Sequence, residues 1–225
     1  EHKQEQLYYR SDHHWTSLGA RYAFEEIAPS LNIFASDFNW QAMKVTDTFS
    51  GTLASTSGSF STCDSIEIYA PENDIQYYVE YSGDPVKYTS IYNSSALDQK
   101  NKYEVFLGGN NPRICITTLN DTGRNLLLIK DSYANCFVQI LLPFFDRILI
   151  VDPRYYYDDI NMLMLEKNYD QVLFFYNLNT FTEDGSLRLI FSDIPVPDPS
   201  EIEPEVTVPE TTEAQTEPET TTEWS

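Results

Sequence analysis

Residues 113–151 read RICITTLNDTGRNLLLIKDSYANCFVQILLPFFDRILIV, and this stretch decides the fold. It opens a series in which apolar strands alternate with helical segments: strand 126–129, helix 134–145, strand 147–151, helix 159–166 and strand 172–176. Near-continuous apolar strands of this kind pair in parallel and are covered on both faces. With right-handed crossovers, the series predicts an α/β fold, a three-layer sandwich built on a mainly parallel sheet.

The segments upstream of this series are more mixed. Thr16 is the predicted N-cap of a helix over 17–28, whose apolar residues recur at helical spacing and which Pro29 ends. Residues 40–110 are rich in Ser, Thr, Tyr and Asn and contain short strand candidates. We interpret them as a β-rich insertion of hairpins and loops within one domain over 1–196.

The composition changes abruptly at Pro197. Residues 198–225 contain nine acidic residues and no Lys or Arg, so the rest of the chain carries −12 of the formal charge of −21. With almost nothing apolar to bury, residues 197–225 are predicted to form a disordered Pro/Thr/Glu-rich acidic tail. Such mixtures resemble the stalks of extracellular proteins, which favours an extracellular or cell-envelope location. The alternative is a flexible terminus that says nothing about location.

The whole chain of 225 residues suits one domain with a tail. Its negative charge argues against nucleic acid or an anionic membrane as a partner. No apolar run approaches the roughly 20 residues of a transmembrane helix. Because the chain begins without Met or a signal peptide, we expect it to be a piece of a longer protein, with any export signal upstream. Cys63, Cys115 and Cys136 are too scattered for a disulfide framework and are interpreted as small core residues.

Ser132 is the best-placed candidate nucleophile. Ligands of open α/β sheets bind beyond the carboxyl ends of the strands, and Asp131 and Ser132 follow one such strand and precede a helix. A serine at this turn exposes its hydroxyl beside backbone N–H groups that can hold an oxyanion. Its hydroxyl needs a neighbouring base to become nucleophilic. The alternative is that Ser132 is a simple N-cap.

The only histidines are His2, His13 and His14, so the choice of base is narrow. An extended backbone at Ser11-Asp12-His13-His14 points Asp12 and His14 to one face and His13 to the other. A carboxylate two residues from an imidazole can accept its N–H and fix its tautomer, as in the back half of a catalytic triad. The alternative is that Ser11 and Asp12 cap the following helix and that the histidines are structural.

Two polar loops are candidates for ligand contacts. Gly109, Asn110 and Asn111 could form an oxyanion hole, because glycine permits close approach and Asn side chains donate hydrogen bonds. The same segment could equally be an ordinary turn. Arg154 and Tyr155 follow a strand at the predicted ligand edge, where Arg could clamp an anionic group and Tyr could stack on a sugar. They could also be ordinary loop residues.

Two other kinds of site are not expected. Asp12, His13 and His14 are consecutive, so their side chains should not converge on one metal ion, and no second His or Cys cluster completes such a site. No Gly-rich phosphate-binding loop follows a strand. We therefore expect neither a metal nor a diffusible organic cofactor.

Together these motifs resemble a known family. The run YYRSDHHWTSLGA at 8–20 looks like the signature of the bacterial DHHW protein family. Later segments also match the pattern of that family: 49–53, 106–110, 130–135 and 152–156. The resemblance extends from Tyr8 to about Phe181. This family is similar in turn to the SGNH-hydrolase-like domains of alginate O-acetylation proteins of the bacterial envelope, in which Asp-x-His likewise precedes Ser.

The resemblance implies an SGNH-hydrolase-like fold with Ser132 as nucleophile, His14 as base and Asp12 as the orienting carboxylate. Lys130 departs from the pattern, since it stands where the usual Gly-Asp-Ser block has Gly, and Gly109 with Asn110 or Asn111 matches the oxyanion residues only loosely. Members of the family also have a long segment ahead of the Asp-His-His-Trp motif. We therefore expect the N-terminal part of the fold to lie upstream of this chain.

The function implied by this resemblance is serine acyl transfer, by an O-acetyltransferase or O-acetylesterase that acts on a bacterial surface polysaccharide. The expected substrate is a carbohydrate or an acylated small molecule, and a membrane protein is a candidate acyl donor. The alternative is a non-catalytic carbohydrate-binding module of the envelope. A purely structural envelope protein is the third and weakest option.

Overall fold

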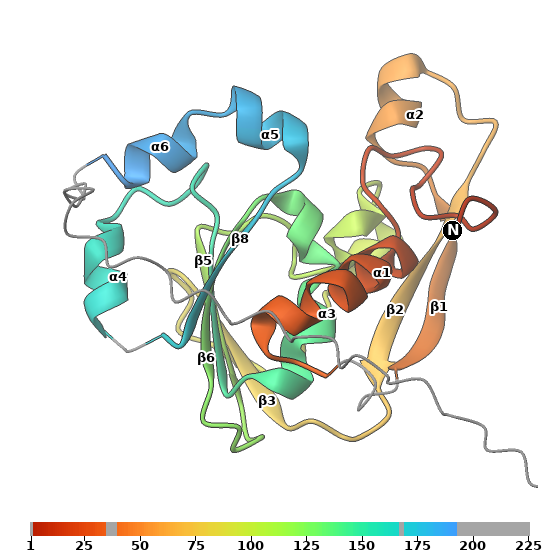
Figure 1. Cartoon of the computed structure of the whole chain (residues 1–225). Helices are drawn as coiled ribbons and strands as arrows, with labels where there is room; N and C mark the ends of the chain where they lie inside the picture. The colour runs from red at the N-terminus through yellow and green to blue at the C-terminus, as the bar shows by residue number, and fades with distance from the viewer. Residues whose placement is uncertain (1, 35–39, 167–168, 193–225) are drawn as a thin grey trace, which may run out of the picture. The chain divides into compact units, whose positions relative to one another are not determined.

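The computed structural model describes residues 2–34, 40–166 and 169–192. These residues form a six-stranded sheet and a separate two-stranded sheet, with helices and 3₁₀ turns around them (Figure 1). The larger sheet has the order β4-β3-β5-β7-β6-β8. Its strands are β3 (Tyr77–Tyr81), β4 (Lys87–Tyr88), β5 (Arg113–Thr118), β6 (Asn125–Lys130), β7 (Arg147–Val151) and β8 (Gln171–Phe175).

The larger sheet is mixed, so the prediction of a mainly parallel sheet is wrong. β6 pairs in parallel with both β7 and β8, as the apolar runs predicted. β5 instead pairs antiparallel with β7 and β3, and β3 pairs antiparallel with β4. The turn at 119–124 is the reason, because a short connection reverses the chain and cannot join two parallel strands.

Both faces of β6 and β7 are buried, whereas Val172 and Phe174 of the edge strand β8 are exposed. On one face, the strand residues belong to the main core cluster: Leu126, Leu128, Ile148 and Ile150. On the other face, the alternate residues are buried outside that cluster: Leu127, Ile129, Leu149 and Val151. In Figure 1, α4 (Ile160–Glu166) lies on one side of the sheet, and α1 (Ser17–Ile27) and α3 (Val138–Leu141) lie on the other. The apolar runs therefore reflect burial from both sides.

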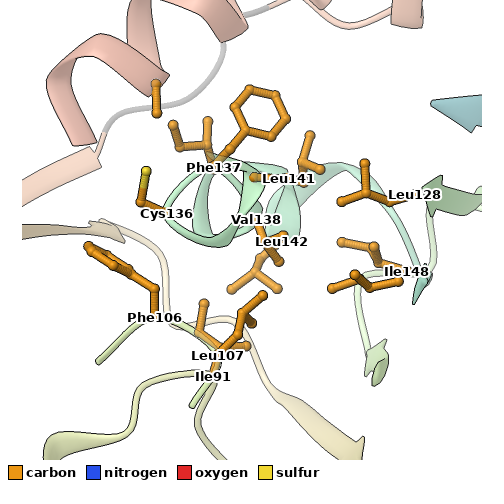
Figure 2. Packing of buried hydrophobic residues seen from close by; sticks show 14 of the residues in the cluster. Ile91, Phe106, Leu107, Leu128, Cys136, Phe137, Val138, Leu141, Leu142 and Ile148 are labelled. Atoms are coloured by element: carbon orange, nitrogen blue, oxygen red, sulfur yellow. The ribbon is translucent and has the colours of Figure 1, made fainter. Parts of the chain in front are cut away.

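The segment after β6 is broken where one helix over 134–145 was predicted. It consists of a 3₁₀ turn at Ser132–Asn135, the single turn of α3, and a second 3₁₀ turn at Leu142–Phe144. Pro143 has no N–H to donate and interrupts the helical ladder. Figure 2 shows Phe137 on one side of this segment and Leu142 on the side of Leu107. A segment apolar all round is buried all round.

The predicted helix near the N-terminus is confirmed as α1. Thr16 is its N-cap and accepts a hydrogen bond from the N–H of Gly19 at 3.2 Å. Ala20 and Phe24 are fully buried on its inner face. A 3₁₀ turn at Ala28–Leu31, which contains Pro29, follows the helix. Ser11 and Asp12 are therefore not needed as caps and are free for another role.

Residues 40–110 contribute to both sheets. β1 (Trp40–Phe49) and β2 (Asp64–Pro71) pair antiparallel, with α2 (Thr52–Ser57) between them in sequence, whereas β3 and β4 join the larger sheet. Helices α5 (Leu178–Glu183) and α6 (Ser186–Ile190) follow β8. The predicted tail at 197–225 lies outside the described residues.

The three cysteines differ in their burial. Cys136 is buried in the core, Cys115 is half-buried and Cys63 is exposed, so the core interpretation is wrong for Cys63. Cys63 lies in the loop before β2, where no apolar layer covers it.

Among the described residues, no helix combines the length and apolar character needed to cross a bilayer.

Candidate active site

A hairpin-like loop carries Asp12 and His14. Tyr8 and Trp15 form an antiparallel bridge at its base, and the N–H of Tyr9 donates to the carbonyl of His14 at 3.1 Å. Inside the loop the backbone bends rather than extends, because the N–H of His14 donates to Oδ1 of Asp12 at 3.1 Å. This local turn is typical of Asp. The loop thus presents Asp12 and His14 toward the interior, where both are buried.

Asp64, the first residue of β2, fixes this loop through hydrogen bonds to its backbone and to the Ser11 side chain. Its buried carboxylate accepts the N–H groups of Ser11 (2.7 Å) and Arg10 (3.1 Å) and the hydroxyl of Ser11 (2.5 Å). Burial raises the pKa of Asp64, but the hydrogen bonds from Ser11 and Arg10 outweigh it and hold the pKa below its ordinary value. Sequence reasoning missed Asp64, because only the fold brings it to a loop some fifty residues earlier.

The carboxylate of Asp12 is bonded through both oxygens. Oδ1 lies 2.5 Å from Nδ1 of His14, and Oδ2 accepts the N–H and the hydroxyl of Thr52 at 2.7 and 3.0 Å. Burial raises the pKa of Asp12, but the bonds from His14 and Thr52 outweigh it and lower the pKa well below its ordinary value. Because a carboxylate can only accept, Nδ1 of His14 carries a proton, which leaves the lone pair of a neutral imidazole on Nε2.

Ser132 meets that lone pair. Its Oγ lies 2.9 Å from Nε2 of His14, although 118 positions separate the two residues. With the Nδ1–H tautomer, the Ser132 hydroxyl donates to Nε2. Ser132 begins the 3₁₀ turn after β6, and the N-cap of that turn is Asp131, whose Oδ1 accepts the N–H of Tyr133 at 2.9 Å. The simple N-cap interpretation of Ser132 is therefore wrong, and its hydroxyl faces the imidazole.

Gly51 allows α2 to approach Asp12. It is the N-cap residue of α2, and its N–H donates to Oγ of Ser11 at 3.3 Å. A Cβ at position 51 would overlap the side chain of Asp12. Only glycine therefore lets the first N–H of α2, on Thr52, reach Oδ2 of Asp12. Residues 49–53 belong to the motif that the sequence singled out, and this contact gives its glycine a physical purpose.

Tyr103 fixes the plane of the imidazole. Its ring stacks on His14 with centroids 4.0 Å apart and planes 11° apart, and its hydroxyl donates to the carbonyl of Ser132 at 3.3 Å. Burial raises the pKa of Tyr103 well above its ordinary value, so the hydroxyl remains a donor. Sequence reasoning missed this residue, because a tyrosine in a short 3₁₀ turn carries no local signal of its partner.

His13 does not point away from His14, so that prediction is wrong. The bent loop brings the two ring centroids to 3.8 Å, and Nδ1 of His13 lies 2.6 Å from Oγ1 of Thr52. The single hydroxyl proton of Thr52 goes to Asp12, so His13 donates to Thr52. Burial, reinforced by His14, lowers the pKa of His13.

The bent loop also removes one argument against a metal site. Ligand atoms of Asp12, His13 and His14 lie within 4.8 Å of one another, so consecutive side chains do converge here. Both ring nitrogens of His14 are engaged, with Asp12 and Ser132, and Nδ1 of His13 is engaged with Thr52. An ion at this position would have to displace one of these hydrogen bonds.

The two asparagines predicted for an oxyanion hole differ in their surroundings. The Nδ2 of Asn111 donates to the carbonyls of Leu107 and Gly109, at 3.1 and 3.5 Å, and closes its own loop. Oδ1 of Asn110 accepts from Nδ2 of Asn135 at 3.1 Å. Asn110 is exposed, and within the described residues its Nδ2 donates to no acceptor. Gly109 has a φ of 93°, a conformation that favours glycine, and turns the chain into Asn110.

Lys130 links Asn135, the hydrogen-bond partner of Asn110, to Asp152 at the end of β7. It is fully buried, and Nζ donates to Oδ1 of Asn135 at 2.9 Å and to Oδ2 of Asp152 at 3.2 Å. Burial lowers the pKa of Lys130, and Asp152 opposes this shift. Arg154 donates to both oxygens of Asp152, at 2.8 and 2.7 Å. Lys130 is therefore a buried link in a charged network.

The predicted substrate contacts, Arg154 and Tyr155, lie in the loop after β7. The guanidinium of Arg154 is already committed to Asp152, and this bond raises the pKa of Arg154. Tyr155 is exposed, and its ring centroid lies 5.5 Å from the guanidinium carbon of Arg154. Arg154 is therefore bound to Asp152, and the exposed ring of Tyr155 lies against the Arg154 guanidinium.

Comparison with known proteins identifies the family. The family model described as DHHW protein matches residues 1–151. The chain belongs to the DHHW protein family. A DHHW family protein from Eubacterium siraeum has a crystal structure that is 26% identical, with a TM-score of 0.69 over 82% of this chain. The chain spans 63% of the length of that relative.

Two structures of Bacillus cereus PatB1 share the fold of this DHHW protein. Each is 21% identical and covers 80% of this chain, with TM-scores of 0.63 and 0.62. They are covered over 63% and 65% of their own length, and the first of them contains a sulfonyl adduct. No curated protein matches the chain.

Replacement of Gly51 by Ala should disturb the Asp12 carboxylate. We expect the free energy of unfolding at pH 7 to fall by about 1–3 kcal/mol, because the methyl group overpacks Asp12. A depressed pKa means that Asp12 stabilises the fold above its unfolded pKa of about 3.9, and that this contribution is lost as the pH falls through the folded pKa. The difference in the free energy of unfolding between Gly51→Ala and wild type should therefore be smaller at pH 3 than at pH 7. Urea unfolding at pH 7 and pH 3 measures both effects.

Gly185→Ala is the matched control for this prediction. Gly185 has a φ of −82°, and a Cβ there would meet nothing within 4 Å. The free energy of unfolding of Gly185→Ala should stay within about 0.5 kcal/mol of that of wild type. Equal effects of the two substitutions would show that Gly51 is not a close-approach position.

Proposed function

We propose that this DHHW protein is a serine acyl-transfer enzyme with an SGNH-hydrolase-like, three-layer fold. The single observation that carries the proposal is the hydrogen-bonded row Asp12–His14–Ser132. It offers a carboxylate that fixes a tautomer, an imidazole with its lone pair toward a hydroxyl, and a serine at the end of a parallel strand. This combination is what nucleophilic catalysis by serine requires.

In the proposed reaction, Nε2 of His14 takes the hydroxyl proton while Oγ of Ser132 attacks the acyl carbonyl carbon. The tetrahedral intermediate collapses, the bond to the leaving alcohol breaks, and His14 returns the proton to that alcohol. The acyl group remains on Oγ of Ser132 as an ester. A sugar hydroxyl or a water, deprotonated by His14, then attacks the carbonyl carbon of this ester. The bond to Oγ breaks, His14 returns the proton to Oγ of Ser132, and the acyl group leaves on the sugar or as the free acid, which gives transferase or esterase activity respectively. Asp12 stabilises the imidazolium in each half-reaction.

The proposed oxyanion donors are the N–H of Ser132 and the Nδ2 of Asn110. The N–H of Ser132 belongs to the first residue of a helical turn, where amides have no partner within the turn. Asn110 is oriented by Asn135, which the buried Lys130 holds in turn. Asn111 is left out of this role, since its amide closes its own loop.

The proposed substrate is an O-acyl group, in particular acetyl, of a bacterial surface polysaccharide, at an extracellular or envelope location, with a membrane protein as candidate acyl donor. The family resemblance and the acidic, Pro/Thr/Glu-rich composition of 197–225 support this assignment. The sulfonyl adduct of B. cereus PatB1 adds a chemical argument, because sulfonyl electrophiles are captured by activated nucleophiles. Tyr155 is retained as a proposed sugar contact, and Arg154 as a support for its loop.

Removal of the Ser132 hydroxyl tests the proposed function. The Ser132→Ala variant should hydrolyse 4-nitrophenyl acetate about 10²- to 10⁴-fold more slowly than the wild-type chain, as expected for loss of a member of such a triad. Ser94→Ala, at an exposed serine, is the matched control and should retain the wild-type rate. Equal rates for Ser132→Ala and wild type would favour the non-catalytic carbohydrate-binding module instead.

The two asparagines provide an internal comparison for the oxyanion assignment. Asn110→Ala should lower kcat for the same ester by roughly 10²-fold, within the range seen when one oxyanion donor is removed, and leave KM nearly unchanged. Asn111→Ala should lower kcat less, because its amide faces backbone carbonyls. A larger loss of kcat in Asn111→Ala than in Asn110→Ala would contradict the assignment.

A further inference from the structure

A second feature beside Ser132 is an aromatic cavity of about 360 Å³. Five rings line it: Tyr8, Trp15, Tyr133, Phe175 and Tyr176. The three residues at the start of α5, 177–179, complete the wall. Its volume falls at the lower end of the roughly 300–1,000 Å³ of small-molecule sites.

Two residues that line the cavity, Trp15 and Tyr133, are chain neighbours of the candidate catalytic residues. Trp15 follows His14 in the chain, and Tyr133 follows Ser132. The ring of Tyr133 lies 5.3 Å from that of His14, and Nε1 of Trp15 donates to the carbonyl of Tyr133 at 2.9 Å. The cavity therefore lies beside the residues that directly follow His14 and Ser132 in the chain.

The loop that carries Asp12 and His14 also positions two of the rings. Tyr8 and Trp15 are directly opposite each other in an antiparallel bridge, and such residues project to the same face. Trp15 is held in place by Tyr133 and Phe175, with centroids 5.8 and 5.7 Å away. Tyr8 is 59% exposed. The Trp15 ring is therefore held by its neighbours, whereas the Tyr8 ring is exposed to solvent.

The polar groups of the cavity carry no formal charge, although the chain as a whole has a charge of −21. Asn177 is already engaged by Asp131 and Thr180, whereas Asn179 lies on the exposed rim.

We propose that this cavity is a subsite for a neutral pyranose ring of the acylated glycan. The inference rests on the proposed function and specifies its substrate class. Aromatic faces pack against the C–H faces of a pyranose, and the exposed Asn179 amide can bond its hydroxyl groups. An anionic sugar finds no cation among the residues that line the cavity.

Kinetic selectivity tests the subsite. The ratio of kcat/KM for an O-acetylated xylo-oligosaccharide to kcat/KM for 4-nitrophenyl acetate should fall about 5- to 10-fold in Tyr8→Ala, through KM for the saccharide, as loss of one aromatic contact predicts. Tyr8→Phe, which keeps the ring, should restore the ratio. Leu119→Ala, at a 75% exposed residue of another loop, should keep the wild-type ratio. An unchanged ratio in Tyr8→Ala would overturn the proposal.

A binding arm separates this proposal from the proposed function. The Ser132→Ala chain is titrated with xylohexaose, cellohexaose and chitohexaose, and the fluorescence of its tryptophans is followed. We expect saturable binding of at least one neutral chain, weakened about 5- to 10-fold by adding Tyr8→Ala. If no ester is turned over but such binding occurs, the proposed function fails and the subsite stands. If none of the three chains binds, or Tyr8→Ala binds them as tightly, the subsite is wrong whatever the esters show.

Discussion

The buried carboxylate of Asp12 is the constraint on which the rest of the site depends. A carboxylate taken out of water must have its oxygens bonded. Here one oxygen pairs with His14 and the other with the first amide and hydroxyl of α2. These bonds determine which nitrogen of His14 carries the proton, and this in turn determines that the other nitrogen receives the Ser132 hydroxyl. The glycine at position 51 leaves α2 close enough to make the second set of bonds.

The scaffold brings the two halves of this site together from segments 118 positions apart. The parallel strands β6, β7 and β8 place Ser132 at the end of β6, as sheets of this kind place their ligands. The hairpin-like loop at the N-terminus is held by Asp64 of the two-stranded sheet, and Tyr103 packs over it from a separate turn. Lys130 adds a buried charge behind the serine. A buried ion pair contributes little net stability, but loss of one partner is strongly destabilising. The pair of Lys130 and Asp152 therefore favours one arrangement of the loop that carries Asn110.

Residue patterns predicted the parts of the structure that depend on local periodicity. The strands β6, β7 and β8 and the helix α1 with its Thr16 cap follow from apolar spacing and capping chemistry. The strand-to-helix position of Ser132 and the Asp12–His14 spacing follow from the same reasoning. The antiparallel direction of β5 follows from the short turn at 119–124, but its place beside β7 was not predicted, because that depends on competition among strands rather than on its own residues. Contacts that span long separations, such as Asp64 with Ser11 and Tyr103 with His14, leave no trace in local sequence. The place of His13 was mispredicted because an Asp-induced turn bends a segment that was treated as extended.

Covalent labelling with phenylmethylsulfonyl fluoride tests the central claim most directly, because it reports whether the Ser132 hydroxyl is activated by His14 without requiring the true substrate. Peptide mass spectrometry locates any adduct, and a commercial serine protease in parallel verifies the reagent. The account predicts one adduct, on Ser132, that is absent or greatly slowed in His14→Ala. An unlabelled chain, an adduct on another residue, or labelling of Ser132 that does not depend on His14 would contradict it.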